Sequence, residues 1–208
     1  MYIGRAVEAD VKSIAALFTV CFYDSVIHHC GKLPKPQAME DVFTLVFRAE
    51  PAAALVAKDD AGAVIGYCFA PARLSAVWRL AITGGYVFQW AWRWLGGRYG
   101  FGFRPVAVMI LNKAAFLRSS LTPAKAADAR ILSIAVHPDA RGQGVAQALL
   151  AEALRYFQSN QVERVRLEVR PANLPAVCVY EKYGFYREGK TTDSQGDWLI
   201  MYREMEQR

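Results

Sequence analysis

Residues Ile131–Ala146 read ILSIAVHPDARGQGVA, which predicts a buried strand, a short turn and the start of a helix. The helix continues to Phe157 with apolar residues on one side and polar residues on the other. A helix begins with unpaired N–H groups and a partial positive charge, so its first turn binds phosphate oxygens well. Gly142 and Gly144 lack a Cβ atom, which lets the backbone approach an anion closely. This turn therefore favours an anion-binding helix start.

The glycine turn has three other possible interpretations. The two glycines could simply make a tight connection from strand to helix, and the turn alone does not separate this from a binding role. A dinucleotide-binding turn needs a third small residue, but Gln147 occupies that position. A nucleotide-binding P-loop ends in Gly-Lys-Ser/Thr, which is missing from this stretch. These last two interpretations are excluded.

The chain on either side of this unit predicts an alternation of strands and helices. Downstream, the period-two pattern of Val162–Val169 indicates a strand. A helix over Ala172–Lys182, closed by Gly184, and a last strand over Trp198–Arg203 follow. Upstream, apolar spacing, breaks and a turn signal predict these elements: strand Tyr2–Arg5, helix Asp10–Cys21, helix Gln37–Phe47, and strands Ala53–Lys58 and Val64–Phe69 joined by the turn Asp59–Gly62.

The stretch from 70 to 129 differs in composition from the rest. Four of the five tryptophans lie there among interleaved arginines, and no Asp or Glu occurs before Asp128. Short helices are expected at Ser75–Thr83, Tyr86–Leu95 and Pro105–Arg118. Because long insertions in compact domains are usually lids or binding loops, we expect this one to be functional.

The overall composition is that of a folded, basic protein. Hydrophobic residues make up 54% of the 208 residues and charged residues 21%, which excludes a disordered chain. The net charge of +6 favours an anionic partner: a phosphorylated cofactor, nucleic acid or an acidic membrane. No repeat or linker divides the chain, so we expect one domain over 1–208, with 70–129 as a helical insertion within it.

The spacing of the cysteines and the length of the apolar runs indicate the cellular compartment of the protein. The four cysteines are dispersed, without a CxxC pair, and the chain opens without a signal-like segment. No apolar run reaches the roughly 20 residues that span a bilayer. A reducing cytoplasm is therefore expected. His28 and His29 adjoin Cys30, but no second cluster of ligands accompanies them, so we expect a loop there and no metal site.

Two motifs in this order resemble the GNAT superfamily of N-acetyltransferases. The CoA motif of that family is Q/R-x-x-G-x-G/A, and Arg141, Gly144 and Ala146 fill its three fixed positions. The second signature is N-x-x-A-x-x-x-Y-E-K-x-G-F, and residues Asn173–Phe185 match it as NLPAVCVYEKYGF. The resemblance covers about 131–204 well, 2–69 loosely and 70–129 not at all.

The resemblance implies an α/β fold of the α+β type, with a mixed, strongly twisted central sheet flanked by helices. In the family the fourth and fifth strands splay apart, and acetyl-CoA lies in the cleft between them. An amine attacks the thioester directly, which calls for a proton acceptor, a proton donor and amides facing the carbonyl oxygen. The resemblance implies Tyr180 as the acid and Glu168 as the base, the latter by its likeness to the ribosomal-protein alanine acetyltransferases. The implied cofactor-binding residues are Ile134, Ala135, Val136, Arg141, Gly142, Gln143, Gly144, Val145, Ala146 and Asn173.

Each of the catalytic assignments has a structural alternative. Tyr180 could be a packed helical tyrosine, and Asn173 could cap the helix that it opens. Glu168 points away from the apolar face of its strand, so it could instead form a solvated ion pair with Arg166 or Arg170.

The sequence leaves the acceptor open, with a primary amine as the default and acetyl-CoA as the default donor. The alternatives are a longer acyl donor, or a non-catalytic CoA-binding or membrane-surface adaptor. The insertion could cover the acceptor cleft, hold an apolar acceptor or acyl chain, or contact an anionic membrane or an acyl-carrier protein. Nucleic-acid binding is not expected, because no recognition motif accompanies the basic and aromatic residues.

Overall fold

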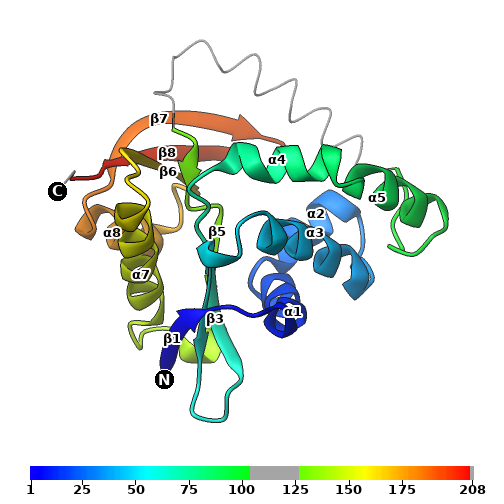
Figure 1. Ribbon diagram of the computed structural model, residues 1–208, viewed down its shortest axis with the longest axis horizontal. Coiled ribbons are helices and arrows are strands. Elements are labelled where there is room, and N and C mark those ends of the chain that lie inside the picture. Colours follow the sequence, from blue (N-terminus) through cyan, green and yellow to red (C-terminus); the bar gives the residue numbers. More distant parts are fainter. Residues whose placement is uncertain (104–126, 207–208) are drawn as a thin grey trace.

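The computed structural model describes residues 1–103 and 127–206, and its strands form two four-stranded sheets (Figure 1). The first sheet is antiparallel throughout, in the order β1-β2-β3-β5. Its strands are β1 (Tyr2–Arg5), β2 (Ala54–Lys58), β3 (Val64–Phe69) and β5 (Ser133–Val136). The Asp59 side chain accepts from the amides of Ala61 and Ala63, which closes the β2–β3 hairpin as the turn signal predicts.

The second sheet has the order β4-β6-β8-β7 and contains one parallel pair, β4 with β6. Its strands are β4 (Ala129–Arg130), β6 (Arg164–Val169), β7 (Tyr186–Asp193) and β8 (Gly196–Glu204). The chain passes between the sheets at two successive residues: the Ile131 amide donates to Arg166 O at 2.9 Å and the Leu132 amide to Phe69 O at 2.9 Å. The predicted mixed sheet with two diverging strands is confirmed, because β5 and β6 belong to different sheets.

Helices cover both faces of the first sheet (Figure 1). Alternate residues of β2 point to opposite sides, as strand geometry requires. Val56 joins a core with α1 and α3, while Leu55 joins a core with α7 and α8. The bounds of these helices are α1 (Val11–Cys21), α2 (Tyr23–Cys30), α3 (Pro36–Ala49), α7 (Val145–Ser159) and α8 (Leu174–Lys182).

Most predicted elements are confirmed to within a few residues, and the exceptions are informative. The expected loop around His28 and His29 is wrong: these residues lie in α2, which ends at Gly31 in the left-handed conformation (φ 78°). The polar strand β7 and the two-residue strand β4 were not predicted. Among the described residues, no single helix is long and apolar enough to cross a membrane; only the pair Glu8–Cys21 and Tyr23–Cys30 reaches that length together, and it is bent by 87°.

The insertion begins with two helices, α4 (Leu74–Thr83) and α5 (Tyr86–Leu95), as predicted. Helix α4 buries Val77 and Ala81 against the α1–α3 core, whereas α5 buries no residue fully. The predicted helix Pro105–Arg118 lies outside the described residues.

Candidate active site

The turn before α7 has the geometry that its glycines predict. Gly142 and Gly144 both have left-handed φ angles, 77° and 79°, and a Cβ added at either would meet no atom within 4 Å. The intrahelical bond nearest the start of α7 runs from the Ala148 amide to Gly144 O at 3.0 Å. The amides of Val145 and Ala146 therefore lack a carbonyl one turn earlier in the helix. The space beside these amides is open, as a ligand would require.

Strand β5 contributes a second set of amides. It is the last strand of its sheet, and the amide of His137 donates to Ile65 O in β3 at 2.8 Å. Because bonding alternates along an antiparallel strand, the amides of Ile134 and Val136 lie on the opposite edge, toward the second sheet. Ala135 pairs with Tyr67 in β3, and its own amide is on the β3 side by the same alternation. The structure thus separates the three expected β5 residues into two on the free edge and one within the ladder.

Arg141 links the turn to the end of β5. Its Nε donates to Val136 O at 3.3 Å, and the same carbonyl accepts from Cys21 Sγ at 3.3 Å. Burial raises the pKa of the Cys21 thiol, although the nearby Arg141 opposes the shift. The neighbouring Gln143 side chain donates to Asp139 O at 3.2 Å and so supports the loop from outside. The guanidinium is therefore held where β5 meets the glycine turn.

Tyr180 lies in α8 inside the core beneath α7. Only 7% of its surface is exposed, and its ring contacts Phe185 edge to face with centroids 5.9 Å apart. Burial, and next the proximity of Cys68, raise the pKa of the phenol well above its usual range. Within the described residues its hydroxyl makes no hydrogen bond. The phenol therefore stays protonated and has a donor to offer.

Asn173 caps α8, as one of its two predicted roles requires. Its Oδ1 accepts from the Ala176 amide at 3.3 Å. The capping bond occupies the carbonyl oxygen and leaves the side-chain NH₂ for another partner. Capping and cofactor contact are thus compatible in this geometry.

Glu168 lies on the face of β6 opposite the core. Its Oε1 accepts from Arg166 Nη2 at 2.5 Å and from Arg130 Nη1 at 3.4 Å, while Oε2 accepts no hydrogen bond from the described residues. The predicted ion pair with Arg166 is confirmed. The predicted partner Arg170 is instead engaged elsewhere, and Arg130, from 38 positions earlier, takes its place.

Residues of the β7–β8 hairpin complete the surroundings of Glu168, and sequence reasoning did not identify them. A hollow of about 350 Å³ is lined by Arg130, Arg166, Glu168, Thr191, Thr192, Asp193 and Trp198. A larger hollow, about 620 Å³, lies apart from it between α4 and the end of α7, near Glu50 and Tyr156. It contains none of the predicted site residues, so the smaller hollow is the relevant one. The missed hairpin residues are polar and have no apolar alternation to signal a strand.

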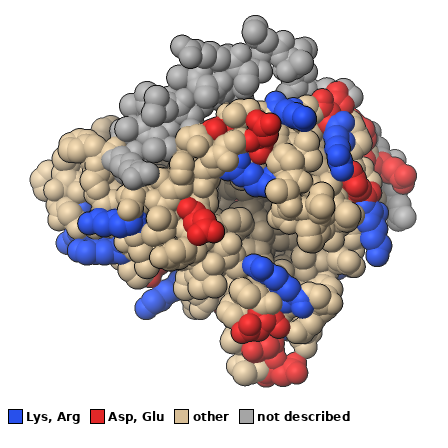
Figure 2. Space-filling model, turned by 180° about the vertical axis from the view of Figure 1, so that it is seen from behind, with Lys and Arg blue, Asp and Glu red and all other residues tan. Residues whose placement is uncertain are grey.

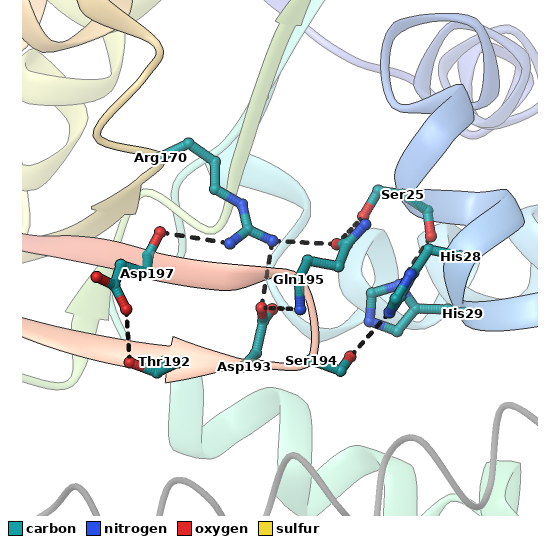
Figure 3. A network of polar contacts seen from close by, with 9 residues as sticks. All are labelled: Ser25, His28, His29, Arg170, Thr192, Asp193, Ser194, Gln195 and Asp197. Carbon is teal, nitrogen blue, oxygen red and sulfur yellow. Dashed lines mark hydrogen bonds and ion pairs between the residues drawn. The ribbon is translucent and has the colours of Figure 1, made fainter.

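The tip of this hairpin reaches across to helix α2 (Figure 3). Ser25 Oγ donates to Gln195 Oε1 at 2.7 Å, and His28 Nε2 and Ser194 Oγ are hydrogen-bonded at 3.0 Å. Arg170 donates to both Asp193 and Gln195, and its guanidinium lies 3.9 Å from the centroid of the Trp198 ring. The side of the molecule opposite Figure 1 is hollowed near its centre, with Lys or Arg side chains above and below the hollow and an Asp or Glu side chain beside it (Figure 2). The two basic groups could pair with the negative charges of an anionic ligand.

The described residues offer no evident metal centre. Nowhere in 1–103 or 127–206 do three or more His, Cys, Asp or Glu side chains come together in a way that could hold a metal ion. His28 is instead hydrogen-bonded to Ser194, and His29 Nδ1 is hydrogen-bonded to Ser25 O at 2.7 Å.

Comparison with known proteins gives consistent results. Residues 12–185 match the sequence profile of the acetyltransferase (GNAT) family. A putative ribosomal protein bS18-alanine N-acetyltransferase of Bacillus subtilis is 37% identical over 79 residues, which are 36% of this chain and 52% of that protein. The chain thus spans about half the length of the curated relatives that it matches.

Solved structures show the same fold at low identity. The ribosomal-protein-alanine N-acetyltransferase of Brucella melitensis superposes with a TM-score of 0.60 at 17% identity, covering 98% of this chain and 99% of that one. The phosphinothricin acetyltransferase of Sinorhizobium meliloti, solved with AcCoA, superposes with a TM-score of 0.58 at 20% identity, covering 98% and 88%.

Proposed function

Because this chain belongs to the GNAT acetyltransferase family, we propose that it transfers an acetyl group from acetyl-CoA to a primary amine by direct attack. The observation that carries the proposal is the open glycine turn of Arg141–Ala146, set at the free edge of β5 where the two sheets diverge. An anionic cofactor with a pyrophosphate and a long flexible arm fits such a helix start joined to a cleft.

The proposed cofactor contacts follow from the amides available. The amides of Gly142, Gln143, Gly144, Val145 and Ala146 would receive the pyrophosphate, with Arg141 adding positive charge. The amides on the free edge of β5, at Ile134 and Val136, would face the thioester carbonyl and stabilise its developing negative charge. Asn173 would contribute its free NH₂ group.

The proposed chemistry transfers two protons. The amine nitrogen attacks the thioester carbon, a C–N bond forms, and the C–S bond breaks to release the CoA thiolate. Tyr180 donates its phenolic proton to that thiolate, and its raised pKa keeps it in the donor form before the reaction. Glu168 Oε2, which makes no bond to the described residues, accepts the amine proton directly or through water. The bulk solvent then restores both groups.

The proposal defines the reaction more narrowly than the acceptor. Some relatives are named for ribosomal-protein alanine and others for mycothiol, so the names of the relatives do not agree on one acceptor. We place the reaction in the cytoplasm, since the four cysteines are all free thiols, as a reducing compartment maintains them. A longer acyl donor and a non-catalytic adaptor remain the competing functions.

One experiment tests the proposal against both competitors. Thermal unfolding is followed with CoA, acetyl-CoA and longer acyl-CoAs, and thiol release is then measured with a panel of amines. We expect stabilisation by acetyl-CoA and amine-dependent release of thiol. A larger stabilisation and faster turnover with a longer chain favour the other donor. Binding without thiol release supports the adaptor, and no binding of any CoA derivative rejects all three.

A further inference from the structure

The floor of the 350 Å³ hollow holds two guanidinium groups and a single carboxylate between them. Arg166 is 8% exposed and Arg130 is largely covered, and within the described residues the hydrogen bonds of both guanidinium groups go only to Glu168, while the Arg166 guanidinium also lies 6.0 Å from the centroid of the Tyr202 ring. The Nε atoms of both arginines are buried without an acceptor. Burial also lowers the pKa of the Arg130 guanidinium. Both cations are thus poorly solvated and incompletely paired.

The other carboxylates near the hollow are engaged elsewhere: Asp128, which also attracts Arg130, accepts hydrogen bonds from Ser75. Asp193 lies in the wall, but it accepts from Arg170 at 3.2 Å and from the Gln195 amide at 2.8 Å. Residues 104–126, outside the described part, contain no Asp or Glu at all. A buried charge without a partner is costly, so a site of this kind is stabilised by an incoming anion.

The walls suit a small polar molecule. Thr191 and Thr192 supply hydroxyl groups, and Trp198 supplies one flat apolar surface. The volume falls at the lower end of the range for small-molecule sites. The unbonded Oε2 of Glu168 lies beside the arginines, so positive and negative groups of a ligand can be bound a few ångströms apart.

We infer that the acceptor is a small zwitterionic amine whose carboxylate or phosphate group binds Arg130 and Arg166 while its amine faces Glu168. This inference rests on the proposed acetyl transfer and names the substrate class for it. Arg130 and Arg166 would then select the substrate, and Glu168 would both align the two guanidinium groups and receive the amine proton.

The test compares amines with and without an anionic group, with each kcat/KM referred to the neutral amine present at the assay pH. Glycine and β-alanine are assayed beside their amides, and phosphoethanolamine beside ethanolamine, at constant ionic strength. We expect kcat/KM to be at least about 10-fold higher for the anionic member of a pair, as charge-assisted hydrogen bonds imply. The two arms distinguish a carboxylate from a phosphate. Equal values for charged and neutral members overturn the inference.

Substitutions test whether the preference for anionic amines depends on the two arginines of the hollow. Arg166→Met and Arg130→Met should abolish the preference between paired amines, with the main change in KM. Arg164→Met is the matched control: it lies in the same strand, pairs with Glu204 at the far end and should keep the preference. Retention of the preference in both hollow variants contradicts the assignment.

Failure of the inference is separable from failure of the proposed function. Stabilisation of the CoA-bound protein by each amine is measured in parallel, because this requires no turnover. Acetyl-CoA binding without selective stabilisation by anionic amines rejects only the acceptor class. Absence of any CoA binding rejects the acetyl transfer itself, and selective binding of anionic amines then still supports the hollow as an anion site.

A different observation, on the insertion, carries a second inference. The outer sides of α4 and α5 expose large apolar side chains: Trp78 is 66% exposed, Phe88 77% and Trp92 79%. Trp78 and Ile82 are four residues apart in α4, and Phe88, Trp92 and Leu95 follow the same helical spacing in α5. Each helix therefore presents one apolar side outward.

The inner side of α5 is held by few contacts. Trp90 packs against the α1–α3 core, and Arg93 Nη1 pairs with Asp41 Oδ1 at 2.5 Å. In the sequence, Arg79 lies in α4 and Arg98 follows α5, and no Asp or Glu occurs between residues 61 and 127; in the structure, Arg73 and Arg79 also line the 620 Å³ hollow beside Glu50 and Asp128. Aromatic and basic residues without acids match a bilayer surface that carries negative charge.

We propose that this α4–α5 face, defined by Trp78, Ile82, Phe88, Trp92 and Leu95, binds the surface of an anionic lipid bilayer. The apolar side chains would enter the headgroup region while the neighbouring arginines contact lipid phosphates. The charge match, rather than exposure alone, favours lipid over an unspecified protein partner.

Flotation with vesicles tests this face. Vesicles of phosphatidylcholine with about 30% phosphatidylglycerol, close to the charge density of an acidic membrane, are compared with pure phosphatidylcholine. We expect flotation with the former, weakened by salt, and loss of flotation in the double variant Phe88→Ser/Trp92→Ser. Val20→Ser, an exposed apolar position on α1, is the control that should float normally. No flotation with either vesicle, or concentration-dependent self-association instead, overturns the proposal.

Discussion

Helices α5 and α7 begin in the same way and differ in everything that follows. Each starts at a glycine in the left-handed conformation, Gly85 with φ 73° and Gly144 with φ 79°, and neither glycine has a side chain to cap the helix. Helix α7 then buries six residues and packs on the first sheet, whereas α5 buries none. A left-handed glycine at the helix start is therefore common to both helices. The packing around the helix decides whether its first turn can belong to a binding site.

The difference in burial between α7 and α5 also suggests different roles for the two sides of the molecule. The α7 side of the molecule holds the core, the glycine turn and Tyr180, while the α5 side contributes an exposed surface. We therefore expect substitutions near α7 to affect folding and chemistry, and substitutions of the exposed side chains of α5 to affect neither.

The largest expected effect is on turnover. Tyr180→Phe removes only the hydroxyl that is proposed to protonate the leaving thiolate, so kcat should fall about 100-fold or more with little change in acetyl-CoA affinity. Steady-state kinetics and calorimetry measure the two quantities. Tyr183→Phe is the control, because its hydroxyl donates to Gln147 O in α7 and lies outside the proposed chemistry. Unchanged turnover in Tyr180→Phe removes this residue from the mechanism.

A matched pair of leucines tests the contrast in packing. Leu149→Ala in α7 removes a fully buried side chain and should lower the free energy of unfolding by about 2–5 kcal/mol. Leu95→Ala in α5 removes an exposed one and should change it by less than about 0.5 kcal/mol. Chemical denaturation of both variants gives these values. Comparable losses would show that α5 is packed as firmly as α7.

The two glycines give a sharper version of the same test. Gly144→Ala and Gly85→Ala both force a Cβ into a left-handed residue with open space around it, so each should cost about 1–2 kcal/mol of stability. Only Gly144→Ala should also weaken CoA binding, by about 10-fold. Calorimetric titration with CoA measures the affinity. Equal affinities in the two variants would break the link between the α7 turn and the cofactor.

The smallest expected effect concerns Cys68 in the core beneath α7. Burial raises the pKa of its thiol to about 12. A raised pKa favours the protonated native state, so this contribution is complete below about pH 9 and is lost as the pH rises toward 12. Cys68→Ala should therefore flatten the fall of the free energy of unfolding between about pH 9 and 10.5, by at most about 1.4 kcal/mol per pH unit. An identical slope in the variant contradicts this.

Elements with a clear apolar period were predictable from the sequence. The strand β6 and the helix α7 carry strict alternation and helical spacing, respectively, and the structure places both within two or three residues of the prediction. The strand β7 reads YREGKTTD and lies at the edge of its sheet, so half of its residues face water and no apolar pattern marks it. Helix α2 has only eight residues and a histidine pair, which also hides its period.

The candidate site residues likewise fall into those that the local sequence predicts and those that it does not. The glycine turn and Tyr180 depend on local sequence, and their positions follow from it. The surroundings of Glu168 depend on Arg130, which lies 38 residues before it, and on residues of the β7–β8 hairpin from Thr191 to Trp198, which lie 23 to 30 residues after it. No local pattern reports a contact between such distant segments, and therefore the pairing of Glu168 with Arg130 could be found only from the structure.

The hairpin tip has a mechanical consequence. The backbone crossing at Ile131 and Leu132 joins the two sheets covalently, so it can serve as a hinge axis. At the other side the sheets are held by side-chain bonds from Ser194 and Gln195 to α2, each worth about 1 kcal/mol. Because residues of both sheets also share one hydrophobic core, we expect these few polar bonds at the tip to break before any other contact between the sheets. Separation of the hairpin tip from α2 would therefore open the molecule at that end alone.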